Sequence, residues 1–246
     1  MILINDARYV DMSHLATEET LAELDREIML GLAKSTTNFL TIGKELTFGI
    51  AEMELYDHRF KDVGIAEREL ADWEIEELKG MNFQQRQQYL KFAKGAYFPW
   101  AICNSLLTGS AWNDKMKPEG KVVTDEAKRL FPKLLEWCYA LPIFESIGRI
   151  CIFGIDASQH VTCHRDADPA KWLTDDELLM VSPRGNKKFY LYDPETKAKF
   201  EPPSKIFIFH DQNYHGVEPT PYFTYNFRIM ESTPRSFEKL CVFSAS

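Results

Sequence analysis

The fold class is set by a stretch after Pro142, Gly148-Arg149-Ile150-Cys151-Ile152-Phe153-Gly154-Ile155. Isoleucine and phenylalanine dominate this stretch and it is too short for a typical helix, so it predicts a buried β-strand. Further short stretches share this character and are separated by Pro, Gly, Asp and Asn residues. They are 178–182, 187–192, 205–210 and 223–230. Because no helical pattern separates the later strands, we expect antiparallel sheets.

The chain before these strands favours helices. Apolar side chains recur at helical spacing within 17–34, 83–98 and 124–141. In the third of these ranges, Thr124 suits the N-cap and is followed by two acidic residues that suit the first turn. Over 43–72, charged residues interrupt the apolar and aromatic ones, so the sequence predicts neither a helix nor a strand there.

Helices followed by a run of strands predict the α+β class. We expect a single domain over 1–246 with a double-stranded β-helix, or cupin-like jelly roll, as its catalytic core over 146–235. The mainly helical part, 1–145, is expected to pack on the sheet as support.

Composition excludes several classes of function. The 246 residues include 29 Lys and Arg against 37 Asp and Glu, a net charge of −8, which disfavours a general nucleic-acid surface. No apolar run approaches the roughly 18 residues of a membrane span, and no signal peptide is evident. The five cysteines are odd in number and form no CxxC pair, so we expect reduced thiols. These features predict a cytoplasmic protein that is a monomer or homodimer.

One tripeptide, His164-Arg165-Asp166, could hold a metal ion. Side chains two positions apart on a strand point to the same face, so this imidazole and carboxylate could bind one ion together. None of the other five histidines has a carboxylate at this spacing. A surface His–Asp pair remains the alternative interpretation.

A second group of residues lies 51 positions further on. His215 follows the apolar run 206–209, and Arg228 comes 13 residues later within an aromatic strand. A buried guanidinium needs an anionic partner, either a structural Asp or Glu or a bound carboxylate. His210 competes with His215 as the second histidine of a metal site.

Two histidines and one carboxylate leave three positions open on Fe(II), which suits a bidentate 2-oxo acid and O2. Over 148–230 the pattern resembles the Fe(II)/2-oxoglutarate-dependent dioxygenase superfamily, whose signature is HxD, a distal His and a later Arg. The resemblance implies that His164, Asp166 and His215 are the catalytic ligands of Fe(II). It also implies that Arg228 binds the distal carboxylate of the cosubstrate 2-oxoglutarate.

The chain departs from many relatives at Met230, where they have Ser or Thr. We therefore expect Tyr190 or Tyr192 to supply the hydroxyl that assists Arg228. The carboxylate at Asp166 implies hydroxylation or a related oxidation, because halogenases of the superfamily have Gly or Ala there.

Arg165 and Arg184 are candidates for binding an acidic or amino-acid-like substrate. The alternative is that they belong to a solvated basic turn. The predicted function is oxidation, in the first place hydroxylation, of a small amino-acid-like or natural-product substrate, as in a biosynthetic enzyme. In this reaction 2-oxoglutarate becomes succinate and CO2. One alternative is the same chemistry on a peptide or protein residue. Another is a cupin-type protein that binds a metal or a sugar.

Overall fold

The computed structural model describes residues 8–36, 71–81, 85, 89, 100–108, 118–164, 177–210 and 213–230. The helices in this part are η1 (Ser13–Leu15), α1 (Glu18–Lys34), α3 (Asp72–Gly80), α5 (Asp125–Leu130) and α6 (Pro132–Ala140). The strands of the N-terminal half are β1 (Val10–Asp11) and β2 (Trp100–Ser105). The remaining strands are β3 (Arg149–Ile155), β4 (Val161–His164), β5 (Glu177–Val181), β6 (Phe189–Asp193), β7 (Ala198–Phe200), β8 (Ile206–His210), β9 (His215–Val217) and β10 (Thr224–Met230).

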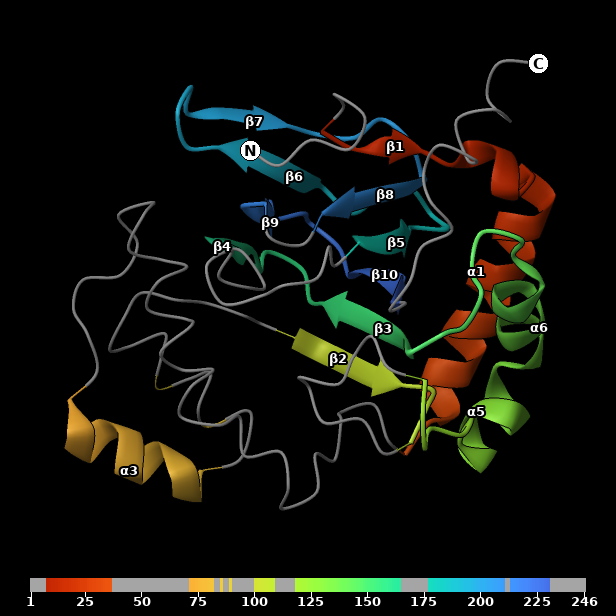
Figure 1. Cartoon of the computed structure of the whole chain (residues 1–246), viewed down its shortest axis with the longest axis horizontal. Coiled ribbons are helices and arrows are strands. Elements are labelled where there is room, and N and C mark those ends of the chain that lie inside the picture. The colour runs from red at the N-terminus through yellow and green to blue at the C-terminus, as the bar shows by residue number, and fades with distance from the viewer. Residues whose placement is uncertain are drawn as a thin grey trace.

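These strands form two antiparallel sheets (Figure 1). The six-stranded sheet has the order β1-β8-β5-β10-β3-β2, and the four-stranded sheet has the order β4-β9-β6-β7. From β3 onward the chain alternates between them: β3, β5, β8 and β10 enter the large sheet, while β4, β6, β7 and β9 enter the small one. This winding is a double-stranded β-helix, so the predicted α+β jelly-roll fold is confirmed.

The two sheets enclose an apolar core between their facing sides. Phe207 and Phe209 of the large sheet pack against Phe189 of the small sheet, with Phe189–Phe209 ring centroids 4.9 Å apart. Because side chains alternate along a strand, every second residue of each strand points into this space. We call these sides of the two sheets the intersheet faces.

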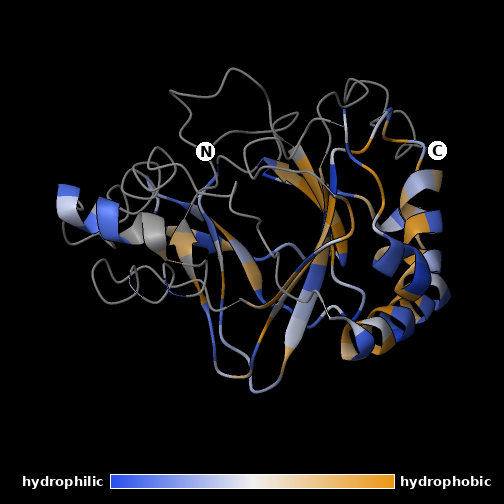
Figure 2. Cartoon of the chain, turned by 90° about the horizontal axis from the view of Figure 1, so that it is seen from below, coloured by the Kyte–Doolittle hydropathy of each residue, from blue (hydrophilic) through white to orange (hydrophobic). Residues whose placement is uncertain are grey.

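The other face of the large sheet is covered by helices α1, α5 and α6. Leu21, Leu24, Ile28 and Leu32 recur along one side of α1 and are buried there. In Figure 2 the helices α1, α5 and α6 lie together on one side of the sheets and combine hydrophobic with hydrophilic segments. Every second residue of β10 packs against these helices. Phe227, for example, contacts Trp137 of α6 edge-on, with ring centroids 5.8 Å apart. The helical support expected from the sequence is thus packed on the sheet.

The start of α5 follows the predicted cap, because Thr124 accepts a hydrogen bond from the Ala127 amide at 3.0 Å. At the start of α1, Thr17 accepts one from the Thr20 amide at 3.2 Å, a cap that was not predicted. The single helix expected over 124–141 is wrong, because it divides into α5 and α6 at Phe131. Phe131 has φ −132° and ψ 44°, outside the helical region, and the following Pro132 begins α6 in the first helical position.

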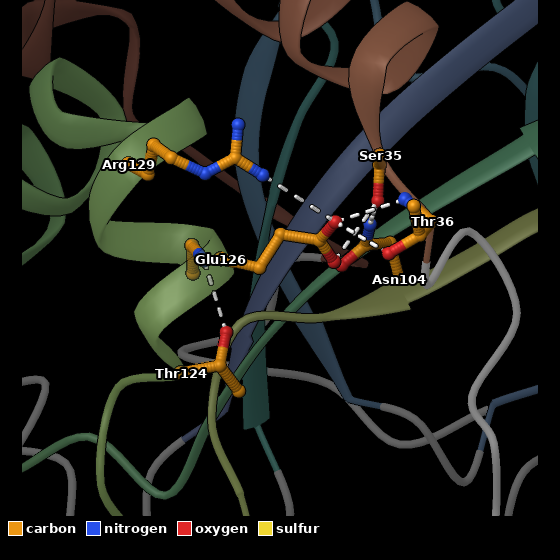
Figure 3. Close-up of polar contacts among 7 residues, drawn as sticks. Ser35, Thr36, Asn104, Thr124, Glu126 and Arg129 are labelled. Atoms are coloured by element: carbon orange, nitrogen blue, oxygen red, sulfur yellow. Dashed lines mark hydrogen bonds and ion pairs between the residues drawn. The ribbon is translucent and has the colours of Figure 1, made fainter.

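A polar network joins the end of α1 to α5 and β2 (Figure 3). The Glu126 carboxylate accepts hydrogen bonds from the Thr36 amide at 2.8 Å and the Thr36 hydroxyl at 3.0 Å. The buried Asn104 amide donates to the Ser35 hydroxyl at 3.0 Å. The network satisfies polar groups at the helix end and holds α1 against the edge of the large sheet.

Strands occur where the sequence predicted none. β1 and β2 extend the large sheet from within the part expected to be mainly helical. Of the range 43–72 only positions 71 and 72 are described, and of the predicted helix 83–98 only Gln85 and Tyr89 are described. Among the described helices, none combines the length and the hydropathy that a membrane crossing requires. The four described cysteines are free thiols.

Candidate metal and carboxylate site

The register of the small sheet brings the two predicted histidine ligands together. β4 and β9 are antiparallel, and His164 lies directly opposite His215, with an irregularity in the ladder between Val161 and His164. Opposite positions in an antiparallel pair share one face of the sheet, with Cβ atoms typically ~4.5–5.5 Å apart. The strand pairing therefore places both positions on the intersheet face of β4 and β9.

The His215 side chain is held within the core by aromatic rings and by its own backbone. It is buried, and its ring centroid lies 5.6 Å from that of Phe189 and 5.2 Å from that of Phe209. Its Nδ1 lies 2.8 Å from the carbonyl oxygen of Asn213. Because a carbonyl oxygen only accepts, Nδ1 carries the proton, and the lone pair of a neutral ring is then on Nε2. This orientation is typical of a metal-binding histidine, and the residues present therefore fit a metal ion.

The third predicted ligand, Asp166, lies outside the described residues, as does Arg165. Within the described part, no three His, Cys, Asp or Glu side chains gather as a metal site would require. The roles of Asp166 and Arg165 stay predictions.

The competing histidine, His210, lies on a different face. In β8, Phe207 and Phe209 join the intersheet core, whereas Ile206 and Ile208 join the core under the helices. Position 210 shares the alternation of Ile206 and Ile208, and it lies opposite Glu177 of β5. This placement separates His210 from the intersheet face of β9.

Arg228 lies on the intersheet face of the large sheet. It is buried in the central strand β10, opposite Cys151 of β3 and Met180 of β5. Its guanidinium carbon lies 4.9 Å from the centroid of the Phe153 ring. An Arg in this position can present two parallel donors to a carboxylate in the space between the sheets.

Two further polar residues lie beside Arg228, and the sequence reasoning did not single them out. Lys187 is buried, and its Nζ donates to the Asn226 side-chain oxygen at 2.5 Å and to the Phe153 carbonyl at 3.2 Å. Burial and the nearby Arg228 charge hold the pKa of Lys187 well below its ordinary value. Strand alternation could have found both residues, because Asn226 is two positions from Arg228 and Lys187 is two positions before Phe189.

The structure places Tyr190 and Tyr192 away from Arg228. Leu191, between them in β6, lies opposite His215 and packs in the intersheet core. The tyrosines therefore point to the outer face of the small sheet, where Lys199 Nζ lies 4.3 Å from the Tyr190 ring centroid. This alternation contradicts their predicted role as the hydroxyl that assists Arg228.

Arg184 is also distant from the intersheet space. Its Nε donates to an Asp25 carboxylate oxygen of α1 at 2.8 Å, and its guanidinium lies 5.9 Å from the Tyr225 ring centroid. Tyr225 belongs to the core under the helices, and its hydroxyl also donates to Asp25. The pairing fastens α1 to the large sheet, which does not fit the predicted contact of Arg184 with substrate.

Several solved structures are similar to this chain. An oxidoreductase of the 2OG-Fe(II) oxygenase family from Burkholderia pseudomallei is 10% identical, with a TM-score of 0.34. The match covers 52% of this chain and 66% of the Burkholderia chain. A prolyl-4-hydroxylase from Pseudomonas putida is 8% identical, with a TM-score of 0.33 over 54% of this chain and 72% of its own. An RmlC-like cupin protein from Desulfovibrio desulfuricans is 18% identical, with a TM-score of 0.26 over 34% of this chain and 71% of its own. No family model and no curated protein matches the chain.

Proposed function

We propose that the protein is a non-haem Fe(II)/2-oxoglutarate-dependent oxygenase that hydroxylates a small amino-acid-like or natural-product substrate. The observation that carries the proposal is the pairing of His164 with His215 on the intersheet face, in a double-stranded β-helix whose other sheet presents a buried Arg228. Two paired histidine positions on one sheet and a buried cation on the other suit a metal-chelating 2-oxo acid with a second, distal carboxylate.

Each residue has a defined task in this proposal. His164, His215 and Asp166 would hold Fe(II), and the Asn213 carbonyl would keep the His215 ring oriented through its Nδ1 proton. Arg228 would bind the distal carboxylate of 2-oxoglutarate. A bound Fe(II) would supply the chemistry that activates O2, and 2-oxoglutarate would provide two electrons as it becomes succinate and CO2.

The environment of the site favours this chemistry. Phe189 and Phe209 pack against the buried His215 ring, so aromatic side chains line this part of the intersheet space. An apolar setting of this kind strengthens the attraction between Arg228 and a carboxylate.

A cupin-type metal or sugar binder is the contrasting possibility, because cupins share the jelly-roll fold. Arg228 distinguishes the two possibilities. A buried guanidinium suits a small anion, whereas a neutral sugar offers it no opposite charge.

The decisive test is anaerobic titration of the Fe(II)-loaded protein with 2-oxoglutarate, followed by visible absorption. Chelation of Fe(II) by the 2-oxo acid should produce a weak charge-transfer band. The band should be lost in His215→Ala and retained in His210→Ala, whose position lies on the other face of its sheet. A wild-type protein that binds Fe(II) but gives neither the band nor any 2-oxoglutarate affinity would contradict the proposal. Oxygen-dependent succinate formation in a screen of amino acids, peptides and sugars would then separate the substrate classes.

A further inference from the structure

Strand β4 has one residue more than the part of β9 with which it pairs. Val161 lies opposite Val217 and His164 lies opposite His215, so three steps along β4 match two steps along β9. An extra residue of this kind is a β-bulge, which bends the strand and re-aims its side chains. Because residues alternate between the faces of a regular strand, positions 161 and 164 share the intersheet face only through this bulge.

A regular ladder between β4 and β9 competes with the bulged one. Without the bulge, Cys163 would lie opposite His215, and position 164 would turn to the outer face of the small sheet. A thiol suits the aromatic surroundings of Phe189 and Phe209 better than an imidazole does, because burial of the more polar ring costs more. A contact elsewhere must therefore favour the bulge.

The Tyr190 phenol lies against the bulge on the outer face of the small sheet. Tyr190 of β6 pairs with Gly216 of β9. A Cβ atom at Gly216 would touch the Tyr190 hydroxyl and lie 2.6 Å from Cζ of the same ring and 2.8 Å from the Val161 carbonyl oxygen. The phenol therefore crosses β9 where that strand has no side chain, and it reaches β4. Burial raises the pKa of Tyr190, and a hydrogen bond with the Cys163 thiol is among the smaller causes.

The ring of Tyr190 is also held from its outer side. The Lys199 ammonium of β7 lies 4.3 Å from the ring centroid and pairs with the Glu218 carboxylate at the end of β9. Tyr190 is buried between this ion pair and Gly216. Its hydroxyl is thereby fixed beside the bulge.

We propose that Tyr190 is a positioning residue of the metal site, whose phenol holds the bulge of β4 and so keeps position 164 opposite His215. The inference rests on the proposed function and adds to it a residue on the face of the sheet away from the two histidine positions. Loss of the hydroxyl should let β4 populate the regular ladder, in which only one of the two histidines faces the intersheet space. Metal affinity then falls in proportion to the fraction of the protein that keeps the bulge.

The test is calorimetric titration of Mn(II) into the metal-free protein, because Mn(II) suits the same ligand types as Fe(II). Tyr190→Phe keeps the ring and removes only the hydroxyl. We expect the Kd of Mn(II) to rise by about two- to tenfold, as for loss of one buried hydrogen bond. Tyr192→Phe is the matched control, because Tyr192 lies on the same face of β6 but pairs with Lys199 of β7, and its Kd should not change. An unchanged Kd in Tyr190→Phe would overturn the proposal.

Deletion of Thr162 separates positioning from general stabilisation of the fold. The deletion removes the extra residue, so the regular ladder itself then places position 164 opposite His215. In this background Tyr190→Phe should change the Kd of Mn(II) by less than about twofold, the range expected for independent sites. An equal rise in Kd in both backgrounds would mean that Tyr190 only stabilises the fold, and the positioning role would be wrong.

Alkylation of Cys163 in the metal-free protein keeps the test informative if the deletion variant fails to fold. The thiol is partly exposed in the bulged strand, whereas the regular ladder would turn it into the intersheet core. Iodoacetamide labelling followed by peptide mass spectrometry should therefore be slower in Tyr190→Phe, by the same factor as the loss of Mn(II) affinity. Equal or faster labelling would contradict the proposal. Absence of Mn(II) binding by the wild type would instead overturn the proposed function, and the labelling rates would still decide whether Tyr190 holds the bulge.

Discussion

His164 of β4 and His215 of β9 lie directly opposite each other in the antiparallel ladder, although 51 residues separate them in sequence. Because of this pairing, the distance between the two proposed ligands depends on how closely β4 packs against β9 and β9 against β6. We therefore expect contacts that hold β4, β9 and β6 together to affect metal binding.

Gly216→Ala should weaken metal binding. A Cβ at this position would lie 2.6 Å from Cζ of the Tyr190 ring and 2.8 Å from the Val161 carbonyl oxygen, distances at which atoms must move. We expect a loss of about 1–3 kcal/mol in the free energy of unfolding, since overpacking forces backbone shifts. Metal affinity should fall as well, because the strand next to His215 is displaced. Isothermal titration with Mn(II) and urea unfolding would measure both, and unchanged metal affinity would show that the ladder tolerates the shift.

Arg228→Ala should weaken binding of the cosubstrate, whereas Arg184→Ala should leave it unchanged. Loss of Arg228 removes a charged partner from the intersheet space, so the Kd of 2-oxoglutarate should rise by about tenfold or more. Loss of Arg184 breaks a partly exposed pair with Asp25 outside that space, with a cost of about 0–1 kcal/mol in unfolding free energy and no change in Kd. Calorimetry on both variants checks the contrast. A higher Kd of 2-oxoglutarate in Arg184→Ala would show that Arg184 affects ligand binding, as its predicted contact with substrate would require.

Gly31→Ala should destabilise the helical layer, although it places a better helix former in α1. The substitution gains about 1 kcal/mol in helix propensity. The new Cβ would lie 2.8 Å and 2.9 Å from Cδ1 and Cζ of the buried Phe131 ring, and overpacking of this kind costs about 1–3 kcal/mol. We therefore expect a net loss of about 1 kcal/mol by urea denaturation. The double variant with Phe131→Leu should recover part of that loss, and purely additive effects would argue against the contact.

Stability should fall at alkaline pH because of Cys138. Burial in α6 raises the pKa of this thiol, so the folded state keeps the proton that the unfolded state releases above its ordinary pKa of about 8.5. The unfolded state then binds fewer protons, and the free energy of unfolding decreases by up to about 1.4 kcal/mol per pH unit for this group. Below that pKa the contribution is complete and does not vary with pH.

The alkaline effect is checked by urea unfolding between about pH 8 and pH 10 for the wild type and Cys138→Ala. The variant should lose some stability at all pH values from the missing side-chain volume, but it should show a shallower decline above the thiol pKa. Parallel declines in the two proteins would mean that Cys138 does not carry the effect.

Strands with several residues of alternating or continuous apolar character were predictable, whereas short ones were not. β3, β8 and β10 fall within predicted ranges because β-branched and aromatic residues dominate them, and β5 overlaps the predicted range 178–182 through its apolar run Leu178–Val181. β4, β7 and β9 have three or four residues, too few for a periodic signal. β4 and β9 form by pairing with strands distant in sequence, whereas β7 pairs with β6 in a local hairpin. The division of the predicted helix at Phe131 could have been foreseen from Pro132, which restricts the residue before it.

The sequence by itself determined the alternation of side chains along each strand, the local helix caps, and the chemical types that suit a metal ion and a carboxylate. It therefore identified His215 and Arg228 and the tripeptide from His164 to Asp166. Only the tertiary structure decided which face each position occupies, because a face is assigned by pairing between strands and not by composition. That assignment moved Tyr190, Tyr192 and Arg184 away from the proposed site and brought Lys187 and Asn226 beside Arg228.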